Sequence, residues 1–201
     1  MRVLVACEFS GTVRRAFAAL GHDAWSCDLL PAEDGSNQHL IGDARQFLRD
    51  GWDLLMVAHP PCTRLCNSGV RWLKVPPKGK TLKQIWRELD EACALFSDFW
   101  NAPIERVCIE NPVMHGHAKK RIVNYAPFAQ SVQPWQFGHP ETKRTCLWLR
   151  GLKPLVPTQV VEGRIARVHR MPPGPFRQRE RSRFFSGVAD AMALQWGGVD
   201  A

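Results

Sequence analysis

Short apolar runs that end abruptly in polar, glycine or proline motifs constrain this chain most. Residues 2–6, 53–58 and 106–109 are rich in Val, Leu and Ile, which favours buried strands. Consecutive prolines follow the second run, and they cannot continue a hydrogen-bonded ladder. Residues 23–27 and 145–149 are further predicted strands, so at least five strands are expected.

Helical patterns separate these strands. Val13, Phe17 and Leu20 are spaced for one helix, and residues 82–100 carry apolar side chains on one face. A last helix is predicted over 181–196. Strands that alternate with helices imply an α/β fold, with a mostly parallel sheet and helices on both faces. The 201-residue length predicts a single domain over 1–201, with residues 63–81 mobile and 150–183 a short Pro/Arg-rich segment.

Three motifs follow predicted strands directly: Phe9-Ser10-Gly11, Pro60-Pro61-Cys62 and Glu110-Asn111-Pro112. In open α/β sheets the ligand binds beyond the carboxyl ends of the strands. We therefore expect the three motifs to crowd one edge of the sheet. The order strand, Gly-containing turn, helix, strand and acid also opens a nucleotide-binding unit, with Asp28 as the acid.

Cys62 is a candidate nucleophile, because a strand-ending loop with two prolines would fix its backbone and expose its thiol. A buried structural cysteine is the alternative. A metal site from His59, Cys62 and Cys66 is a third reading, but no second ligand pair at zinc spacing accompanies them, so no metal is predicted.

Carboxyl groups end two of the predicted strands. Glu110 ends an apolar run, where burial would raise its pKa and make it a usable proton donor, although it could instead be a capping carboxylate. Asp28 is placed to hold a ribose, and Asp43 could face an adenine or cap a helix.

The chain carries 27 Lys and Arg against 19 Asp and Glu, a net charge of +8. The stretch 164–183 holds seven arginines and one acid, which accounts for +6. Such a patch suits a polyphosphate partner, and the alternative is a solvated basic tail. The expected nucleic-acid contacts are Arg64, Arg71, Lys74, Arg177, Arg179 and Arg181, with Lys78, Lys80 and Lys83 nearby.

The composition is that of a protein outside the membrane. No apolar run approaches the roughly 20 residues that span a bilayer, and the N-terminus turns acidic too early for a secretory signal. Seven scattered cysteines favour reduced thiols over a disulfide framework, so a cytoplasmic location is expected, the host's if the chain is phage-encoded.

These motifs, with Gly42-Asp43 and the run 53–62, occur in the order found in DNA (cytosine-5) methyltransferases, which the chain resembles over residues 2 to about 115. The resemblance is weaker at 141–145 and 186–191. In its compact form the chain looks like the short phage-encoded cytosine methylases. The resemblance implies a Rossmann-like fold of the S-adenosylmethionine (SAM)-dependent methyltransferases, and methyl transfer from SAM to C5 of cytosine in DNA.

The same resemblance assigns roles to particular residues. Cys62 would add to C6 of cytosine while Glu110 assists protonation at N3. The implied catalytic residues are Cys62, Glu110, Asn111 and Arg144, with Arg144 holding the base. The implied cofactor-binding residues are Phe9, Ser10, Gly11, Asp28, Asp43 and Pro60.

Several positions depart from the family pattern. Thr12 and Val13 follow Gly11 without a second glycine, His59 precedes the prolines, and Thr63 follows Cys62. Only about 40 residues stand where the family carries its target-recognition region, which predicts low or very short sequence specificity. The alternatives are the same chemistry on a free deoxycytidine nucleotide or a single strand, or an inactive nucleic-acid-binding protein.

Overall fold

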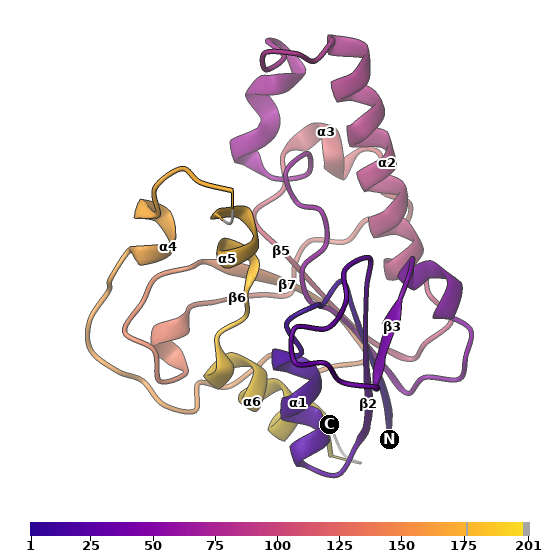
Figure 1. The fold of residues 1–201 in the computed structure, drawn as a ribbon, viewed down its shortest axis with the longest axis vertical. Helices are drawn as coiled ribbons and strands as arrows, with labels where there is room; N and C mark the ends of the chain where they lie inside the picture. The colour runs from indigo at the N-terminus through magenta and orange to yellow at the C-terminus, as the bar shows by residue number, and fades with distance from the viewer. Residues whose placement is uncertain (176, 199–201) are drawn as a thin grey trace.

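A seven-stranded sheet forms the centre of the computed structural model, which describes residues 1–175 and 177–198 (Figure 1). The strands are β1 (Arg2–Ala6), β2 (Asp23–Asp28), β3 (His39–Ile41), β4 (Leu54–Val57), β5 (Arg106–Asn111), β6 (Gln130–Val132) and β7 (Thr145–Arg150). Their order is β3-β2-β1-β4-β5-β7-β6. β1 to β5 are parallel, and β7 runs antiparallel to both β5 and β6.

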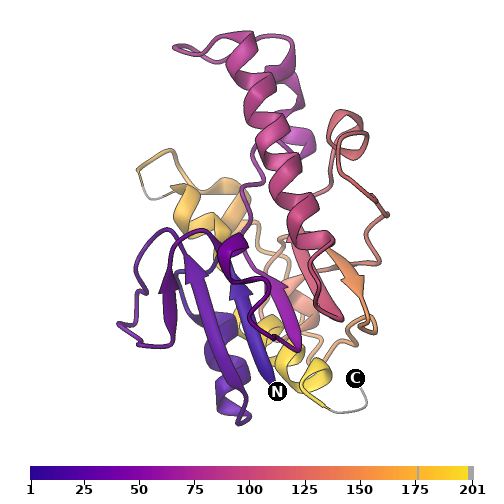
Figure 2. The same ribbon diagram turned by 90° about the vertical axis from the view of Figure 1, so that its right-hand side faces the viewer.

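Helices cover both faces of this sheet, which confirms the predicted fold class. The α-helices are α1 (Thr12–Ala19), α2 (Leu82–Trp100), α3 (Gly116–Lys119), α4 (Arg167–Arg170), α5 (Arg177–Ser182) and α6 (Ser186–Trp196). The 3-10 helices are η1 (Ala44–Phe47), η2 (Asn67–Leu73) and η3 (Pro134–Gln136). α1 and α6 lie side by side on one face, and α2 packs on the other (Figures 1 and 2).

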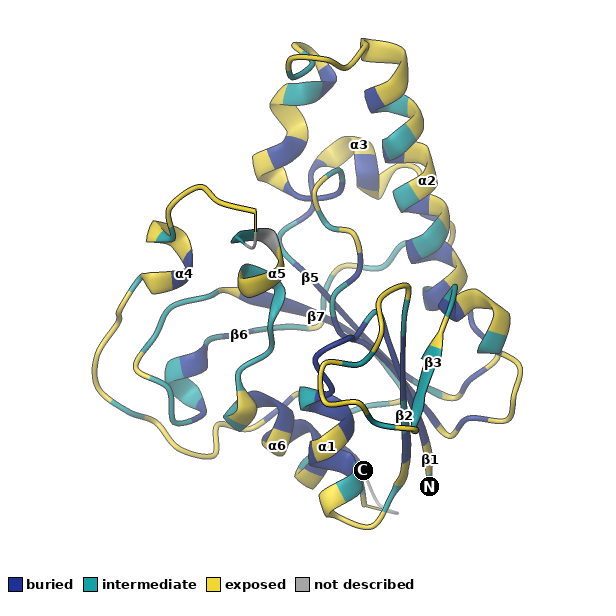
Figure 3. Cartoon of the chain, in the orientation of Figure 1, coloured by how far each residue is buried: buried dark blue, intermediate teal, exposed yellow. Residues whose placement is uncertain are grey.

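The alternation of side chains along each strand divides the core into two layers. In β1, Leu4 and Ala6 face the α2 layer, whereas Val3 and Val5 face α1 and α6. Both sets are fully buried, and the central strands are the darkest part of Figure 3. A parallel sheet buried on both faces explains why its strands read as continuous apolar runs in the sequence.

α2 has the bounds that its periodicity predicts. Thr81 caps its first turn, accepting from the backbone N–H of Gln84 while the Gln84 side chain accepts from Thr81 N–H. Ile85, Leu89 and Phe96 are buried against the sheet. The N-terminal turns of the helix project beyond the strands (Figure 2).

The expected end of the strand at 106 needs correction. The strand at 106 does not stop before Glu110, because Glu110 pairs with Leu147 and Asn111 with Cys146 on β7. The three-residue strands β3 and β6 and the short helices were not predicted, because each is too short to show a period.

The predicted helix over 181–196 is in fact two helices, α5 and α6. Residues 183–185 between them are not helical, and the backbone of Phe185 is extended. The Lys143 ammonium group donates to the carbonyl oxygens of Ser182 (3.2 Å) and Arg183 (2.9 Å), which would otherwise accept helical hydrogen bonds. We call residues 182–185 the connector.

Residues 63–81, which composition suggested to be mobile, contain η2 and are anchored to the chain after β5. Asn67 N–H donates to the Val113 carbonyl at 2.9 Å, and His115 N–H donates to the Leu65 carbonyl at 3.1 Å. Cys66 also forms an isolated β-bridge with Met114. These contacts hold the segment that follows Cys62 in a defined place.

The close packing of α6 predicts one stability effect. A Cβ at Gly187 would lie 1.9 Å from the Phe137 carbonyl oxygen, so Gly187→Ala must displace backbone. We expect a loss of about 1–3 kcal/mol in the free energy of unfolding in urea. Gly116→Ala is the control, because nothing lies within 4 Å of that Cβ, and it should change stability by less than about 0.5 kcal/mol. Equal losses in both variants would contradict this packing.

Candidate active site

The three motifs meet at the carboxyl edge of the sheet. β1, β4 and β5 are adjacent and parallel, with Ala6 opposite Val57 and Val57 opposite Ile109. The chain therefore leaves all three strands at the same edge, as expected from the sequence. The loop after β4 remains tied to β1 by Ala58 N–H, which donates to the Ala6 carbonyl at 2.9 Å.

Cys62 lies in a tight turn directly after the prolines. Its carbonyl oxygen accepts from the N–H groups of Leu65 and Cys66, both at 3.0 Å. Gly69 allows η2 to pack on this turn, since a Cβ there would lie 2.0 Å from the Thr63 carbonyl oxygen. The Cys62 thiol is half-buried, and interaction with Cys66, burial and the charge of Glu110 together raise its pKa.

Glu110 is buried near the end of β5, with 8% of the residue exposed. Burial raises its pKa to about 7, and the nearby Lys143 ammonium opposes that rise. The direction is the one expected for an acid that ends an apolar strand. A carboxyl group with this pKa is present in both protonation states near neutral pH, which suits proton donation.

Lys143 is a residue that the sequence reasoning missed. Its side chain interacts electrostatically with both Glu110 and Cys62, and burial lowers its pKa. Arg144, to which the resemblance gave the role of holding the base, is exposed. Since Glu110 faces Leu147 across the ladder, Lys143, Thr145 and Leu147 share its face of the sheet, and Arg144 does not. Alternation along the chain identifies Lys143 only once the register of β7 on β5 is known.

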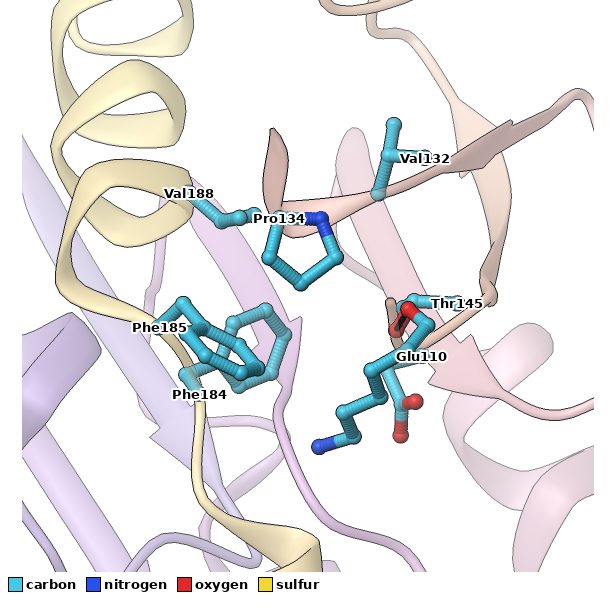
Figure 4. A pocket seen from close by; sticks show the side chains of 8 residues that line it. Glu110, Val132, Pro134, Thr145, Phe184, Phe185 and Val188 are labelled. Carbon is cyan, nitrogen blue, oxygen red and sulfur yellow. Dashed lines mark hydrogen bonds between the residues drawn. The ribbon is translucent and has the colours of Figure 1, made fainter. Parts of the chain in front are cut away.

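The space beside Glu110 is nearly closed. A cavity of about 10 Å³ remains there, room for about one water molecule. Figure 4 shows Phe184 and Phe185 on one side of this cavity, with Glu110 and Thr145 on the other. The connector thus fills most of the space beside Glu110.

Ion pairs and ring contacts hold the connector and α5 in this position. Arg179 and Arg183 both pair with Glu33, and both guanidinium groups lie over the Phe9 ring, at 4.9 and 5.7 Å. The Phe184 ring lies 5.3 Å from the His59 ring. The same contacts therefore cover Phe9 and close the space beside Glu110.

Two buried polar atoms at this edge lack partners among the described residues: His59 Nε2 and Asn111 Oδ1. Asn111 Nδ2 donates to the Pro112 carbonyl oxygen at 2.7 Å. Burial, together with the charges of Lys143 and Arg183, lowers the pKa of His59 to about 3, so its imidazole is neutral. Both atoms are available to a ligand.

A larger cavity of about 800 Å³ adjoins the turn and lies at the switch point between β1 and β4. Its walls include Asp28, Gly42 and Asp43, together with His59 and Pro61 of the proline loop. Pro60 is buried and is not among the lining residues. This volume suits a nucleoside-sized ligand.

The two acids of this cavity differ in their surroundings. Burial raises the pKa of Asp28, whose Oδ1 accepts from the Leu30 N–H at 3.0 Å. Asp43 caps η1 and pairs with Arg45 through both oxygens, which lowers its pKa. Asp28 is therefore the acid with free capacity to accept from a ligand.

A buried side chain of the protein fills the space at the glycine turn after β1. Glu8, fully buried, accepts from the Val13 N–H at 2.7 Å and the Arg14 N–H at 3.1 Å, so it occupies the N-terminus of α1. Gly11 adopts φ +67°, and Ser10 is buried. Phe9, Ser10 and Gly11 are not among the residues that line the large cavity. The sequence reasoning missed Glu8, although an acid just before a helix start is a recognisable signal.

The basic residues expected to contact phosphates are mostly engaged. Arg64 and Lys80 both pair with Glu88, and the Arg177 Nε donates to the Met171 carbonyl oxygen at 2.8 Å. Arg71 is exposed and lies 4.2 Å from the centre of the Trp72 ring.

The remaining basic side chains are likewise either ion-paired or at least partly exposed to solvent. The side chain of Arg167 pairs with Glu141. Lys74, Lys78 and Lys83 are exposed, and Arg181 is half-buried. Three of the seven arginines in 164–183 are thus ion-paired, namely Arg167, Arg179 and Arg183, so the segment is not one uniform basic face.

Two further observations concern residues 1–175 and 177–198. No three His, Cys, Asp or Glu side chains there are grouped to hold a metal ion. Within the same ranges, every helix is too short or too polar to cross a lipid bilayer.

No family model matches the chain, and no curated protein matches its sequence. Solved structures resemble the chain at low sequence identity. One, described as a DNA modification methyltransferase encoded within an E. coli prophage, is 13% identical, with a TM-score of 0.49 over 86% of this chain. The S. pombe Dnmt2 methyltransferase is 18% identical, with a TM-score of 0.42 over 85%. The match spans about 55% of each of those chains.

The raised pKa of Glu110 predicts a pH-dependent stability. Unfolded Glu110 ionises near pH 4.5, whereas the folded group keeps its proton to about pH 7. Between these values the folded state binds more protons, so the Glu110 contribution to the free energy of unfolding falls as pH rises. Relative to Glu110→Gln, the wild type should lose about 1–3 kcal/mol between pH 4.5 and 7.5 in urea unfolding.

The matched control is Glu91→Gln, which removes a carboxylate that is 66% exposed on α2. That variant should follow the wild-type pH dependence. If the stability of Glu110→Gln shows the same pH dependence as that of the wild type, the pKa of Glu110 is not raised in the folded protein.

Proposed function

We propose that this chain catalyses SAM-dependent methyl transfer to C5 of cytosine in DNA, through a covalent adduct on Cys62. The observation that carries the proposal is the grouping of a thiol, a carboxyl group with a pKa near 7 and a buried ammonium group beside a large cavity. Cytosine C5 is a poor nucleophile until C6 carries a nucleophile and N3 a proton. Cys62 and Glu110 are suited to those two tasks.

The residues that line the large cavity fit SAM. Asp28 would accept hydrogen bonds from the ribose hydroxyl groups, and the neutral His59 offers an unpartnered nitrogen. Asp43, which is hydrogen-bonded to Arg45, would contact the adenine together with that arginine. When bound, SAM supplies an electrophilic methyl group, and the turn at Pro61 would set its distance from the base.

The protein's part in the reaction is to make C5 nucleophilic. Cys62 loses its thiol proton to solvent and its sulfur bonds to C6 while Glu110 gives its proton to N3, so that the ring becomes an enamine. After C5 has been substituted, its proton is lost and Cys62 departs, which restores the aromatic ring. Asn111 Oδ1, which lacks a partner among the described residues, would accept a hydrogen bond from the substrate.

Lys143 takes the role that the sequence resemblance gave to Arg144. Its ammonium group faces Glu110 and Cys62, so it would stabilise the carboxylate left after proton donation and hold the base. Arg144 is exposed and lies on the other face of the strand.

DNA binding would have to open the connector. The space beside Glu110 holds about one water molecule, and the ion pairs that close it also cover Phe9. Phosphates can compete with Glu33 for Arg179 and Arg183, because guanidinium groups bind phosphates well. A flipped base could then enter between Cys62 and Glu110, and Phe9 could reach the cofactor.

The free-nucleotide reading has support of its own. Arg64, Arg177 and Arg179 already have partners in the protein, so fewer cations are free for a long phosphate backbone. An inactive binding protein is the third reading, and the grouping of Cys62, Glu110 and Lys143 argues against it.

The decisive assay measures methyl transfer from labelled SAM to duplex DNA, to single-stranded DNA and to deoxycytidine nucleotides. We expect transfer to C5 of cytosine in duplex DNA. Cys62→Ser should abolish it while SAM binding, followed by calorimetry, changes little, because a hydroxyl is far less ionised than a thiol. Cys93→Ser, a buried cysteine on α2 that is not among the residues lining the large cavity, is the control. Full activity of Cys62→Ser overturns the mechanism, and activity only on nucleotides overturns the DNA assignment.

The ion pairs that close the connector predict how Glu33→Gln changes the affinity for duplex DNA. Glu33→Gln should free Arg179, leave Arg183 paired only with Glu180, and increase duplex affinity about 3- to 10-fold at moderate salt. Fluorescence anisotropy across salt concentrations should also show a steeper salt dependence. Glu162→Gln, the same charge change on an exposed residue, should leave the slope unchanged. Equal effects of the two variants would show that only net charge matters.

A further inference from the structure

His115 is a buried histidine on the chain that follows β5, and it takes no part in the reaction proposed above. Only 4% of the residue is exposed. Its ring Nε2 lies 2.7 Å from the carbonyl oxygen of Arg64, in the turn of residues 62–66 that we call the Cys62 turn. Its ring Nδ1 lies 3.1 Å from the backbone nitrogen of Ala118, in the first turn of α3. Both ring nitrogens therefore have a partner.

These two partners determine the tautomer of the ring. A carbonyl oxygen can only accept, so Nε2 must carry a hydrogen and donate it to Arg64. A backbone N–H can only donate, so Nδ1 must be bare to accept from Ala118. The His115 imidazole in this arrangement is neutral, with its one donor on the Cys62 turn and its one acceptor on α3.

Two consecutive peptide groups connect His115 to the Cys62 carbonyl oxygen. The first joins Arg64 to Leu65. Its C=O accepts from the His115 ring, and its N–H donates to the Cys62 carbonyl oxygen at 3.0 Å. The second joins Leu65 to Cys66. Its C=O accepts from the His115 backbone N–H at 3.1 Å, and its N–H donates to the Cys62 carbonyl oxygen at 3.0 Å. Because hydrogen bonds in such chains polarise one another, each strengthens the next.

The other end of these bonds belongs to the strand that carries the acid. His115 follows Glu110 by five residues, and β5 is held in the sheet as far as Asn111 by its pairing with β7. The bonds of His115 therefore join the Cys62 turn to the end of β5. The bond from the ring is the one that a substitution can remove, because the others join backbone groups.

We propose that His115 is a positioning residue, whose Nε2–H holds the Cys62 turn in place relative to Glu110 for addition to the cytosine ring. Its role in the reaction rests on the proposed function. Its hold on the turn does not, and can be measured without any turnover. A reacting group that is displaced by about 1 Å can lose about a hundredfold in rate, so a single anchoring bond is expected to matter.

Asparagine and glutamine separate the two bonds of the ring. His115→Asn places an oxygen near the position of Nδ1, so it keeps the acceptor for Ala118 and loses the donor to Arg64. His115→Gln places an amide nitrogen near the position of Nε2, so it keeps a donor for Arg64. The proposal therefore predicts that His115→Gln is closer to the wild type than His115→Asn at the Cys62 turn.

The matched control is Ser97→Ala, which also removes a buried side chain that bridges two segments. The Ser97 hydroxyl donates to the Cys93 carbonyl oxygen at 2.7 Å and accepts from the Val123 N–H at 3.0 Å. Ser97 thus joins α2 to the chain after α3, and it has no role in the proposed reaction. This variant separates a general loss of stability from a local effect on the Cys62 turn.

Amide hydrogen exchange, followed by NMR in the protein without ligands, tests the hold on the turn. His115→Asn should speed exchange at Leu65 and Cys66 by about tenfold or more, because their N–H groups donate within the Cys62 turn. His115→Gln should recover part of the protection. Ser97→Ala should speed exchange at Val123 instead. Unchanged exchange at Leu65 and Cys66 in His115→Asn overturns the proposal, as does a His115→Gln variant no better protected than His115→Asn.

Single-turnover methyl transfer to duplex DNA tests the role in the reaction. His115→Asn should lower the rate at saturating SAM and DNA by about tenfold or more, while the Kd for each changes less than about twofold. His115→Gln should recover part of the rate, and Ser97→Ala should keep it. A normal rate in His115→Asn contradicts the positioning role. If the wild type transfers no methyl group, the proposed function fails, and the exchange result alone decides whether His115 holds the Cys62 turn.

Discussion

The buried ammonium group of Lys143 connects the parts of this site. It opposes the rise in the Glu110 pKa, it interacts with Cys62, and it binds two carbonyl oxygens of the connector. A buried charge needs such partners, because removal from water costs several kcal/mol. One side chain thus ends α5, positions the connector and provides the cation beside the acid and the thiol.

This arrangement makes the closed state and the reactive state compete for the same groups. While the connector is closed, the Lys143 ammonium group donates hydrogen bonds to the Ser182 and Arg183 carbonyl oxygens, and the Arg183 guanidinium group pairs with Glu33. On the proposed function, a base would enter only when the connector moves, and Lys143 would then lose its two carbonyl partners and turn to Glu110 and the substrate. On the proposed function, substrate binding and assembly of the catalytic groups are therefore coupled.

The sequence predicted the frame of the molecule and the place of its chemistry. Apolar runs and their terminating motifs predicted β1, β4, β5 and the shared edge, because a doubly covered parallel strand must be apolar throughout. The bounds of α2 followed from its period. The roles of the individual site residues remain predictions.

What the sequence did not predict depends on contacts distant along the chain. Lys143 rather than Arg144 faces Glu110 because of the register of β7 on β5, which no local pattern contains. The break between α5 and α6 depends on the same lysine. The engagement of Arg179 with Glu33, 146 residues away, also needed the fold.

The central claim is that Cys62 attacks cytosine within this site, and a trapped adduct tests it most directly. Duplex DNA containing 5-fluorocytosine, incubated with SAM, should yield a denaturant-stable protein–DNA complex, because the fluorine blocks the elimination that releases the enzyme. Peptide mapping should place the linkage on Cys62, and Cys62→Ser should give none. A linkage to Cys66 or to any other residue, or no complex under conditions in which methyl transfer occurs, would contradict the account.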